Sequence, residues 1–328
     1  MNKKIKLFDP VIGKSEEEIT KKILSSKFWA SGAGTGYVEK FENNFKKFVG
    51  SQKCFAVNSG TAALHLALSL YDIKNKEVII PSLSFVSTAH AVVYNGGIPV
   101  FADVDLKTLC IDPDDVKKKI SKKTALILPV HFAGMPCNLT RIDELAKSRK
   151  LSVVEDAAHA CGAKFKGKRI GAHTNTVCFS FHPVKNLAMP TGGLIAINNF
   201  KDKKIVNNIL AKRWCGITDR KNLEYDVKEI GWNYYMNEIS AGIGCVQLKK
   251  LDKLNKKRTV IGRKFSIKMN VEQKMSYSTD CVYHFYWILV KNRKKFIEKM
   301  KKNGIETGIH YKPIHQMSLY KNNQKIPN

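Results

Sequence analysis

The sequence has no run of about 18 apolar residues, the length needed to cross a bilayer, so no membrane span is expected. The opening residues, Met1-Asn2-Lys3-Lys4-Ile5-Lys6, are basic, but neither an apolar stretch nor a cleavage site follows them, and we expect no secretion. The eight cysteines are scattered singly and form no CxxC pair. Several of them lie inside apolar runs. This pattern predicts reduced, buried thiols in a cytoplasmic protein, and no metal site.

Acidic residues are scarce: 28 Asp and Glu face 56 Lys and Arg, which gives a formal net charge of +28. Such a charge could attract a polyanion, whether nucleic acid, an acidic membrane surface or a nucleotide diphosphate. It could also be a lysine bias spread over solvated helix faces, as in Lys117-Lys118-Lys119. Because no RNA- or DNA-binding motif accompanies the charge, we favour the second interpretation. We expect neither nucleic acid nor a membrane as a partner. The positive charge should mildly steer an anionic substrate towards the protein.

Short apolar runs alternate with amphipathic stretches along most of the chain, without an internal repeat or a flexible linker. The strand-like runs are Cys54–Val57, Val78–Ile80, Val100–Ala102, Ala125–Val130, Leu151–Glu155, Val177–Phe181 and Leu194–Ile197. The helix-like stretches include Thr61–Leu70, Ser84–Tyr94 and Leu139–Lys147. This alternation predicts an α/β fold, with a mostly parallel central sheet and helices on both of its faces.

A long helical pattern over Asn237–Asn255 leads to a smaller C-terminal unit. There we expect a strand over Tyr283–Val290, a helix over Lys294–Asn303 and a second strand over Ile305–Tyr311. The chain is therefore divided into a large domain, residues 1–250, and a small α/β domain, residues 251–328.

Three polar side chains follow strand-like runs: Asp156, Ser180 and Lys185. Ligands of parallel sheets bind beyond the carboxyl ends of the strands, where these side chains would lie. Together they are what a pyridoxal phosphate site requires. The lysine forms a Schiff base with the cofactor aldehyde, and the carboxylate keeps the pyridine nitrogen protonated, so that the ring acts as an electron sink.

Each of these residues also has a plainer interpretation. Asp156 could pair with a buried Lys or Arg instead of a pyridine nitrogen, because buried acids need a cationic partner. His159 could hydrogen-bond the phenolic oxygen of the cofactor. Alternatively, it could have a structural role, as a capping residue or as a side chain that fills space. In a chain so rich in lysine, Lys185 alone would be a surface charge. The combination of the three favours the cofactor site.

Two further strand-to-helix junctions carry candidates. At Ser59-Gly60-Thr61, the helix start offers free N–H groups, and Gly60 lets a phosphate approach the backbone closely. The alternative is an ordinary N-cap turn. Phe85 could stack on a flat heteroaromatic ring, or it could be a core phenylalanine.

The chain resembles the DegT/DnrJ/EryC1/StrS family of pyridoxal-phosphate-dependent nucleotide-sugar aminotransferases, which have the aspartate aminotransferase (type I) fold. The resemblance runs through nearly the whole length and rests on segments that occur in the family's order. They are Gly34–Glu42, SGTAAL at 59–64, EDAAHA at 155–160, SFHPVKN at 180–186, GWNY at 231–234 with QLKKL at 247–251, and HYKPIH at 310–315.

The resemblance implies a role for each matching residue. Lys185 would be the Schiff-base lysine and would shuttle the proton between the substrate carbon and the cofactor. Asp156 would pair with the pyridine nitrogen, His159 would bond the phenolic oxygen and Phe85 would stack on the ring. The phosphate would be held by Gly60, Thr61 and Ser180, with Asn233 of a second subunit. The sugar-nucleotide side would be lined by His310, Tyr311 and His315. The implied partners are an amino donor, a nucleotide-sugar substrate and a second copy of the chain.

The chain departs from the family's pattern at three places. Tyr235 stands where the family usually has Arg, and Pro190-Thr191-Gly192-Gly193 lacks the usual acid. The C-terminal domain is short relative to the family, which predicts reduced stability or altered substrate enclosure.

Two alternatives stay open at this stage. One is a sugar dehydratase of the same fold, although such relatives carry His in place of the lysine. The other is a degenerate, non-catalytic relative, which could bind nucleic acid through its positive charge.

Overall fold

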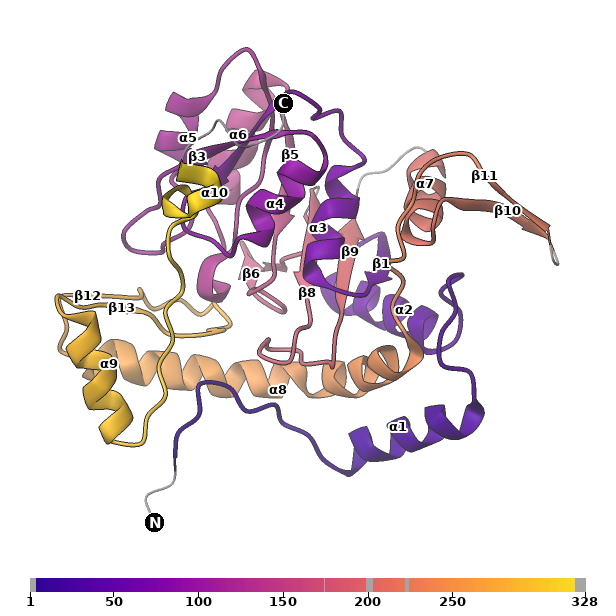
Figure 1. Ribbon diagram of the computed structural model, residues 1–328. Helices are drawn as coiled ribbons and strands as arrows, with labels where there is room; N and C mark the ends of the chain where they lie inside the picture. Colours follow the sequence, from indigo (N-terminus) through magenta and orange to yellow (C-terminus); the bar gives the residue numbers. More distant parts are fainter. Residues whose placement is uncertain (1–3, 174, 199–202, 222–223, 322–328) are drawn as a thin grey trace.

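A seven-stranded sheet lies at the centre of the computed structural model, which describes residues 4–173, 175–198, 203–221 and 224–321 (Figure 1). The strands follow the order β1-β9-β8-β5-β4-β2-β3. Their bounds are β1 Lys53–Val57, β2 Glu77–Pro81, β3 Ile98–Ala102, β4 Thr124–Ile127, β5 Ser152–Asp156, β8 Thr176–Ser180 and β9 Gly193–Ile197. Neighbours from β3 to β8 are parallel, whereas β9 is antiparallel to both β8 and β1. The predicted, mostly parallel α/β sheet is confirmed.

The two faces of the sheet carry separate hydrophobic cores. Along β2, Val78 and Ile80 enter one core and Ile79 enters the other. This follows from the strand geometry, in which successive side chains point to opposite faces. Because both faces are covered, the strands are continuous apolar runs and not alternating ones.

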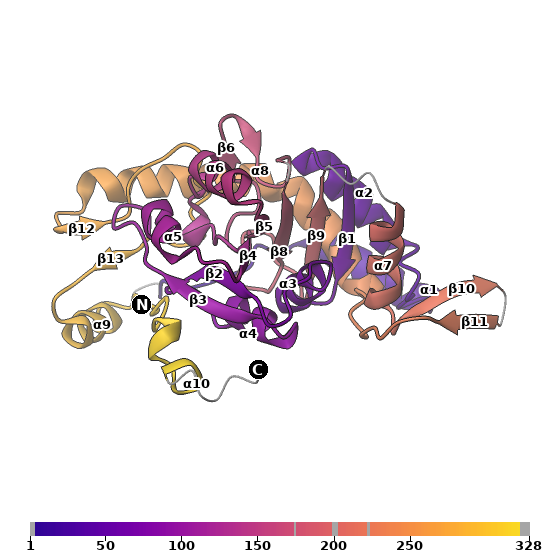
Figure 2. The ribbon, with the colours of Figure 1, turned by 90° about the horizontal axis from the view of Figure 1, so that it is seen from above.

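Helices cover both faces, as Figure 2 shows from above. One face carries α3 (Gly60–Leu68), α4 (Ser87–Tyr94) and α7 (Lys203–Arg213), and the other carries α2 (Tyr37–Val49), α5 (Pro113–Lys119) and α6 (Leu139–Arg149). In α2 the buried residues recur at helical spacing, at Val38, Phe41, Phe45 and Val49. The helix ends at Gly50, whose φ of 84° is the left-handed conformation that glycine adopts readily.

The long helix α8 (Glu238–Lys268) passes beneath the sheet in Figure 1, with α1 (Lys14–Ser26) packed against it. It begins where the sequence predicts, because Asn237 caps it by accepting a hydrogen bond from the N–H of Ser240 over 2.8 Å. It continues well past the predicted end at Asn255, which is buried inside the helix. The predicted domain boundary at residue 250 lies within α8, and the division into two domains stays a prediction.

The C-terminal region is less regular than the sequence predicts. The predicted helix forms as α9 (Arg293–Lys302), but the strand predicted over 283–290 shortens to β13 (Ile288–Leu289), which pairs with β12 (Gln273–Lys274). The strand predicted over 305–311 is wrong, since within the described residues only Ile305 of this segment forms a bridge, to Ile5. An extended segment becomes a strand only when a partner runs beside it, and here the partner is a single residue long.

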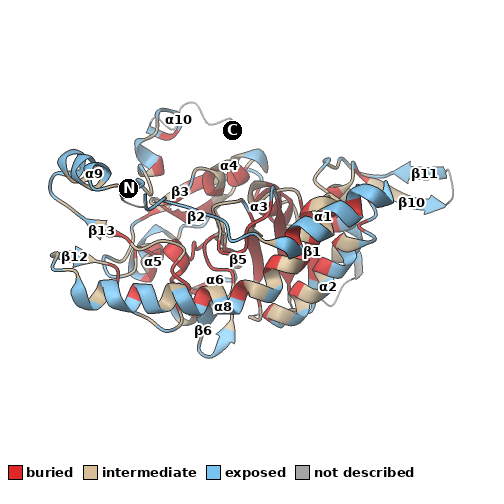
Figure 3. Cartoon of the chain, turned by 90° about the horizontal axis from the view of Figure 1, so that it is seen from below, coloured by how far each residue is buried: buried red, intermediate tan, exposed pale blue. Residues whose placement is uncertain are grey.

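The remaining elements are short. They are the hairpins β6 (Lys164–Phe165) with β7 (Lys168–Arg169) and β10 (Ile217–Lys221) with β11 (Glu224–Val227), the turns η1 (Phe132–Gly134) and η2 (Ile314–Gln316), and α10 (Ser318–Lys321). Figure 3 shows that α9 and the β10–β11 hairpin are largely exposed, whereas the central strands are buried. Seven cysteines are buried and all eight are free, but Cys215 is exposed, contrary to the expectation of buried thiols. Over the described ranges, every helix is too short or too polar to cross a membrane.

Candidate active site

The carboxyl ends of β5 and β8 bring the predicted site residues together. Asp156 is the last residue of β5, Ser180 is the last of β8, and Lys185 follows in the next loop. Because the two strands are parallel and Asp156 is paired in register with Cys178, both ends open at the same edge of the sheet. The N-terminus of α3 meets this edge at Gly60.

Asp156 is buried, with 4% of its surface exposed, and both carboxylate oxygens have donors. Oδ2 accepts the hydroxyl of Thr88 over 2.9 Å, and Oδ1 accepts the N–H of Ala158 over 3.0 Å. Ser84 in turn hydrogen-bonds the Thr88 hydroxyl over 2.7 Å. Burial raises the pKa of Asp156, while these two hydrogen bonds and the charge of Lys185 act in the opposite direction. A further cation at this carboxylate would stabilise its ionised form.

Lys185 is partly buried, and burial lowers the pKa of its amine to about 8 despite the opposing charge of Asp156. A larger fraction of the amine is therefore neutral near pH 7 than in a solvated lysine, and the neutral amine is the nucleophile. The next residue anchors the loop: Asn186 donates to Asn255 Oδ1 over 2.9 Å and to the carbonyl of Val282 over 3.0 Å. The lysine is thus held between the sheet and α8.

Gly60 lies directly against Ser180. A Cβ at Gly60 would lie 2.6 Å from Ser180 Cβ and 3.0 Å from Oγ, so a side chain there would fill the space beside the serine hydroxyl. Ser59 caps α3 by accepting the N–H of Ala62 over 3.1 Å, which is the plainer role considered for this turn. The N–H groups of Gly60 and Thr61 lie in the first helical turn, where no helix carbonyl can accept them. The Thr61 hydroxyl bonds Ser87 over 2.7 Å.

Aromatic side chains and histidines line the opposite side of the site. His159 is buried; its Nδ1 accepts the N–H of Ala133 over 3.3 Å, and its Nε2 lies 3.1 Å from the Tyr311 hydroxyl. Burial, and secondarily the charge of Lys185, lower the pKa of His159 well below its usual value. His310 stacks on Phe285, with centroids 4.4 Å apart.

Three predicted residues lie at the margins of this group. Phe85 is 54% exposed, and its ring is 5.8 Å from that of Tyr311. His315 is exposed and contacts Phe101, with a centroid separation of 6.3 Å. Asn233 is exposed, and its backbone carbonyl accepts the side chain of Asn58 over 3.1 Å. Among the described residues, His315 and Asn233 thus contact Phe101 and Asn58 respectively, and neither is found in contact with Lys185.

The departures from the family pattern also have defined positions. Tyr235 pairs through its backbone with Val57, at the end of β1. In the loop without the acid, Thr191 donates to the carbonyl of Asn58, and a Cβ at Gly193 would lie 2.2 Å from the carbonyl oxygen of Ser59. Both segments therefore support the turn before α3.

Several residues of the site were missed in the sequence. Thr88 and Ser84 support Asp156 from α4 and the segment before it, and His284 stacks on His159 with centroids 4.6 Å apart. A signal existed for the first pair, because Ser84 and Thr88 are polar residues four apart in an apolar helical stretch. No local signal marks Ala133 or His284, since only the tertiary fold brings them to His159.

The residues present fit pyridoxal phosphate. The donor set combines a buried carboxylate, a lysine with lowered pKa and a helix N-terminus with close backbone access at Gly60. A cavity of about 250 Å³ adjoins Lys185 and is bordered by the N-terminal residues Phe8 and Val11 and by Lys257 and Arg258 of α8.

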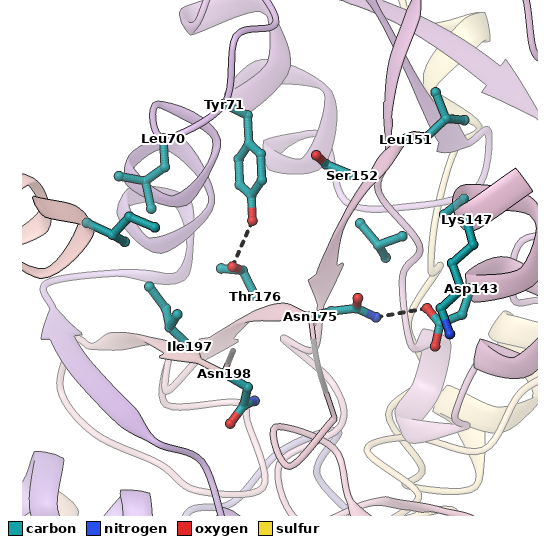
Figure 4. Close-up of a pocket in the computed structure, with 13 residues that line it drawn as sticks. Leu70, Tyr71, Asp143, Lys147, Leu151, Ser152, Asn175, Thr176, Ile197 and Asn198 are labelled. Carbon is teal, nitrogen blue, oxygen red and sulfur yellow. Dashed lines mark hydrogen bonds between the residues drawn. The ribbon is translucent and has the colours of Figure 1, made fainter. Parts of the chain in front are cut away.

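A separate cavity of about 310 Å³ lies at the amino ends of β5 and β8 (Figure 4). Tyr71 bonds Thr176 over 2.9 Å there, and Asn175 bonds Asp143 over 3.2 Å. Two pairs of its polar side chains thus bond each other, and none of the predicted site residues lines it.

The comparison with known proteins agrees with this geometry. The model of the DegT/DnrJ/EryC1/StrS aminotransferase family matches residues 10–328. An uncharacterized protein of Methanocaldococcus jannaschii is 35% identical over 333 residues, covering 96% of this chain and 85% of that protein. GDP-perosamine synthase of Escherichia coli O157:H7 is 34% identical over 325 residues, and the match covers 97% of this chain and 87% of that protein. The putative sugar aminotransferase Spr1654 of Streptococcus pneumoniae, in its PMP form, is 25% identical with a TM-score of 0.91, covering 98% of this chain and 87% of that one.

These matches confirm the resemblance inferred from the sequence motifs and the type I fold. They also confirm the expected class of enzyme, an aminotransferase, and its cofactor, pyridoxal phosphate.

Proposed function

Because the chain belongs to the DegT/DnrJ/EryC1/StrS aminotransferase family, we propose that it transfers an amino group from a donor, L-glutamate, to a nucleotide-linked keto-sugar. The acceptor would be a 4-keto-6-deoxy or 3-keto hexose, as in the biosynthesis of amino sugars for surface polysaccharides. The observation that carries the proposal is the pairing of Lys185, whose pKa is lowered to about 8, with the buried carboxylate of Asp156. The similarity to GDP-perosamine synthase supports a nucleotide-linked sugar.

In this reaction pyridoxal phosphate supplies an electron sink for the carbon that loses a proton. Lys185 would bond the cofactor aldehyde and then carry the proton between the substrate carbon and the cofactor carbon. Asp156, oriented by Thr88 and Ala158, would keep the pyridine nitrogen protonated. His159 would donate its Nε2–H to the phenolic oxygen.

The other residues would bind and orient. Phe85 would cover one face of the cofactor ring. Gly60 and Thr61 would offer backbone N–H groups to the phosphate, and Ser180 its hydroxyl. A second copy of the chain would add its Asn233.

The substrate side would be formed by His310, Tyr311 and His315. In the cavity beside Lys185, the cations Lys257 and Arg258 outnumber the single carboxylate of Asp9, and this balance supports an anionic substrate. Phe8 and Val11 add apolar surface to the same cavity, which suits the flat base of a nucleotide.

The function is tested by supplying ¹⁵N-labelled L-glutamate and a panel of keto-sugar nucleotides to the cofactor-loaded protein. Mass spectrometry should find the label in the sugar nucleotide, with 2-oxoglutarate as the second product. Loss of a sugar hydroxyl without nitrogen transfer would identify a dehydratase instead. Release of 2-oxoglutarate with no labelled sugar from any acceptor would contradict a sugar substrate while leaving the first half-reaction intact.

The shared active site is tested by mixing two inactive variants, Lys185→Ala and Asn233→Ala. In a mixed dimer, one site would contain both mutations and the other would contain none. Activity should therefore reappear on mixing. If each site were built from one chain, the mixture would stay inactive.

A further inference from the structure

Two histidine rings stack beside the active-site lysine. The rings of His159 and His284 have centroids 4.6 Å apart and an interplanar angle of 28°. Both residues are anchored on Ala133: its N–H donates to His159 Nδ1 over 3.3 Å, and its carbonyl accepts the backbone N–H of His284 over 2.9 Å. One residue of η1 therefore connects the ring of His159 to the backbone of His284.

The backbone around Ala133 is closely packed. Ala133 has a φ of 56°, a left-handed conformation that is unfavourable for a residue with a side chain and persists only when the surrounding contacts impose it. At Gly134, a Cβ would lie 2.9 Å from the His159 carbonyl oxygen and 2.9 Å from Val282 Cγ2. The connection between the two histidines has little room to shift.

The hydrogen bond from Ala133 also determines which nitrogen of His159 carries the proton. Because Nδ1 accepts, the hydrogen of the neutral ring must be on Nε2. The ring stays neutral, since burial, the charge of Lys185 and the neighbouring His284 and His310 all lower its pKa. Its Nε2–H then points to the Tyr311 hydroxyl, 3.1 Å away.

His284 acts on this ring through its face. Its Nδ1 is buried, and no hydrogen-bond partner for it is found in the parts of the chain that the structure describes. Burial and the charge of Lys185 lower its pKa well below the usual value, so two neutral rings can stack without charge repulsion. The Tyr311 ring lies 6.1 Å from that of His159, at an angle of 27°, with its hydroxyl at the Nε2 edge of the histidine.

We propose that His284 is a positioning residue, whose ring holds the plane of His159 so that the Nε2–H can donate to the phenolic oxygen of the cofactor in place of the Tyr311 hydroxyl. The proposal rests on the function proposed above, in which His159 is the partner of that oxygen. A flat ring at residue 284 is sufficient for this role, and its nitrogen atoms are not required.

The test compares His284→Phe, which keeps a flat ring, with His284→Leu, which fills similar space without one. The first readout is the tautomer of His159 in cofactor-free protein, from ¹⁵N NMR of histidine-labelled samples, with the His159 signal assigned by its loss in His159→Gln. The phenylalanine variant should keep the wild-type Nε2–H signals. The leucine variant should show a mixture of tautomers, because its side chain does not hold the ring plane.

The second readout is the pH at which the visible absorbance of the bound cofactor changes. In His284→Leu this transition pH should rise by about one unit. A phenolic oxygen that has lost its hydrogen-bond donor keeps more negative charge, so the proton on the nearby Schiff-base nitrogen is held more tightly. In His284→Phe it should stay near the wild-type value. If His284→Leu does not fold, His284→Met serves the same comparison.

The proposal is overturned if the leucine or methionine variant is folded and keeps both the wild-type tautomer and the wild-type spectral transition, as a purely structural role predicts. It is also overturned if phenylalanine behaves like leucine. A failure of the sugar amination assay would leave the NMR result unaffected, so the two proposals can be separated.

Discussion

The hydroxyl of Thr88 donates a hydrogen bond to Oδ2 of Asp156 over 2.9 Å and so connects the first turn of α4 to the end of β5. Both side chains are buried, so water does not replace this donor when it is lost. The carboxylate that would face the pyridine nitrogen is therefore oriented by a residue 68 positions earlier in the chain.

Thr88→Val removes the hydroxyl while keeping the shape of the side chain. We expect the affinity for pyridoxal phosphate to fall about thirtyfold, since a hydrogen bond to a charged group contributes about 2 kcal/mol. Titration of cofactor-free protein, followed by visible absorbance, measures this. Thr88→Ser keeps the hydroxyl donor and should bind pyridoxal phosphate almost as tightly as the wild type does. An equal loss of affinity in both variants would indicate a packing effect.

Asp156→Asn removes the charge that stabilises a protonated pyridine nitrogen. We expect kcat/KM to fall about a thousandfold, which corresponds to ~4 kcal/mol in the activation barrier. Steady-state transamination assays measure the change.

The neighbouring Glu155 is the matched control. It lies on the same strand but accepts from His131 over 2.8 Å and from Asn175 over 2.8 Å. Glu155→Gln would place an amide against one of these donors, so it should lower the free energy of unfolding by about 2 kcal/mol and leave kcat unchanged. A loss of kcat comparable to that of Asp156→Asn would contradict these assignments.

Gly60→Ala would place a Cβ 2.6 Å from Ser180 Cβ and fill the space beside its hydroxyl. We expect the affinity for pyridoxal phosphate to fall about a hundredfold, or ~2.7 kcal/mol. Gly13→Ala, where no atom lies within 4 Å of the added Cβ, is the control and should bind the cofactor normally. Unchanged affinity in Gly60→Ala would rule out close phosphate approach at this turn.

The rate of cofactor loading should depend on pH through Lys185. Only the neutral amine attacks the aldehyde, and burial lowers the pKa of Lys185 to about 8. The rate constant should therefore rise about tenfold per pH unit below this pKa and level off above it, whereas a solvated lysine would level off only above about 10.4. Because Asp156 raises the pKa of Lys185, Asp156→Asn should move the plateau to lower pH. Stopped-flow absorbance checks both statements.

The sequence predicted the residues that follow strands and missed those that reach the site from elsewhere. Asp156, Ser180 and Lys185 were accessible because buried strands are recognisable as apolar runs, and parallel strands end at a common edge. The spacing of Ser84 and Thr88 marks two polar residues on one side of an apolar helical stretch, but their contact with Asp156 depends on how α4 packs on β5, which no local pattern encodes.

The C-terminal region shows the same limit. The segment before Tyr311 looks like a strand by composition, but its one bridge in the described part of the chain is from Ile305 to Ile5. The helix α8 continues beyond Asn255, where the sequence predicted its end. Asn255 is polar but buried, and it hydrogen-bonds the side chain of Asn186 and the carbonyl of Cys161. A polar residue that bonds inside the fold cannot be distinguished from a helix end by its sequence.

The central claim is that Lys185 and Asp156 form the active site of an aminotransferase, and the most direct measurement is the visible spectrum of the cofactor-loaded protein during addition of L-glutamate. The wild type should lose its visible absorbance as pyridoxamine phosphate and 2-oxoglutarate form, and Lys185→Ala should not complete this conversion. A wild-type protein that holds the cofactor but shows no spectral change with L-glutamate or any other amino donor would contradict the claim.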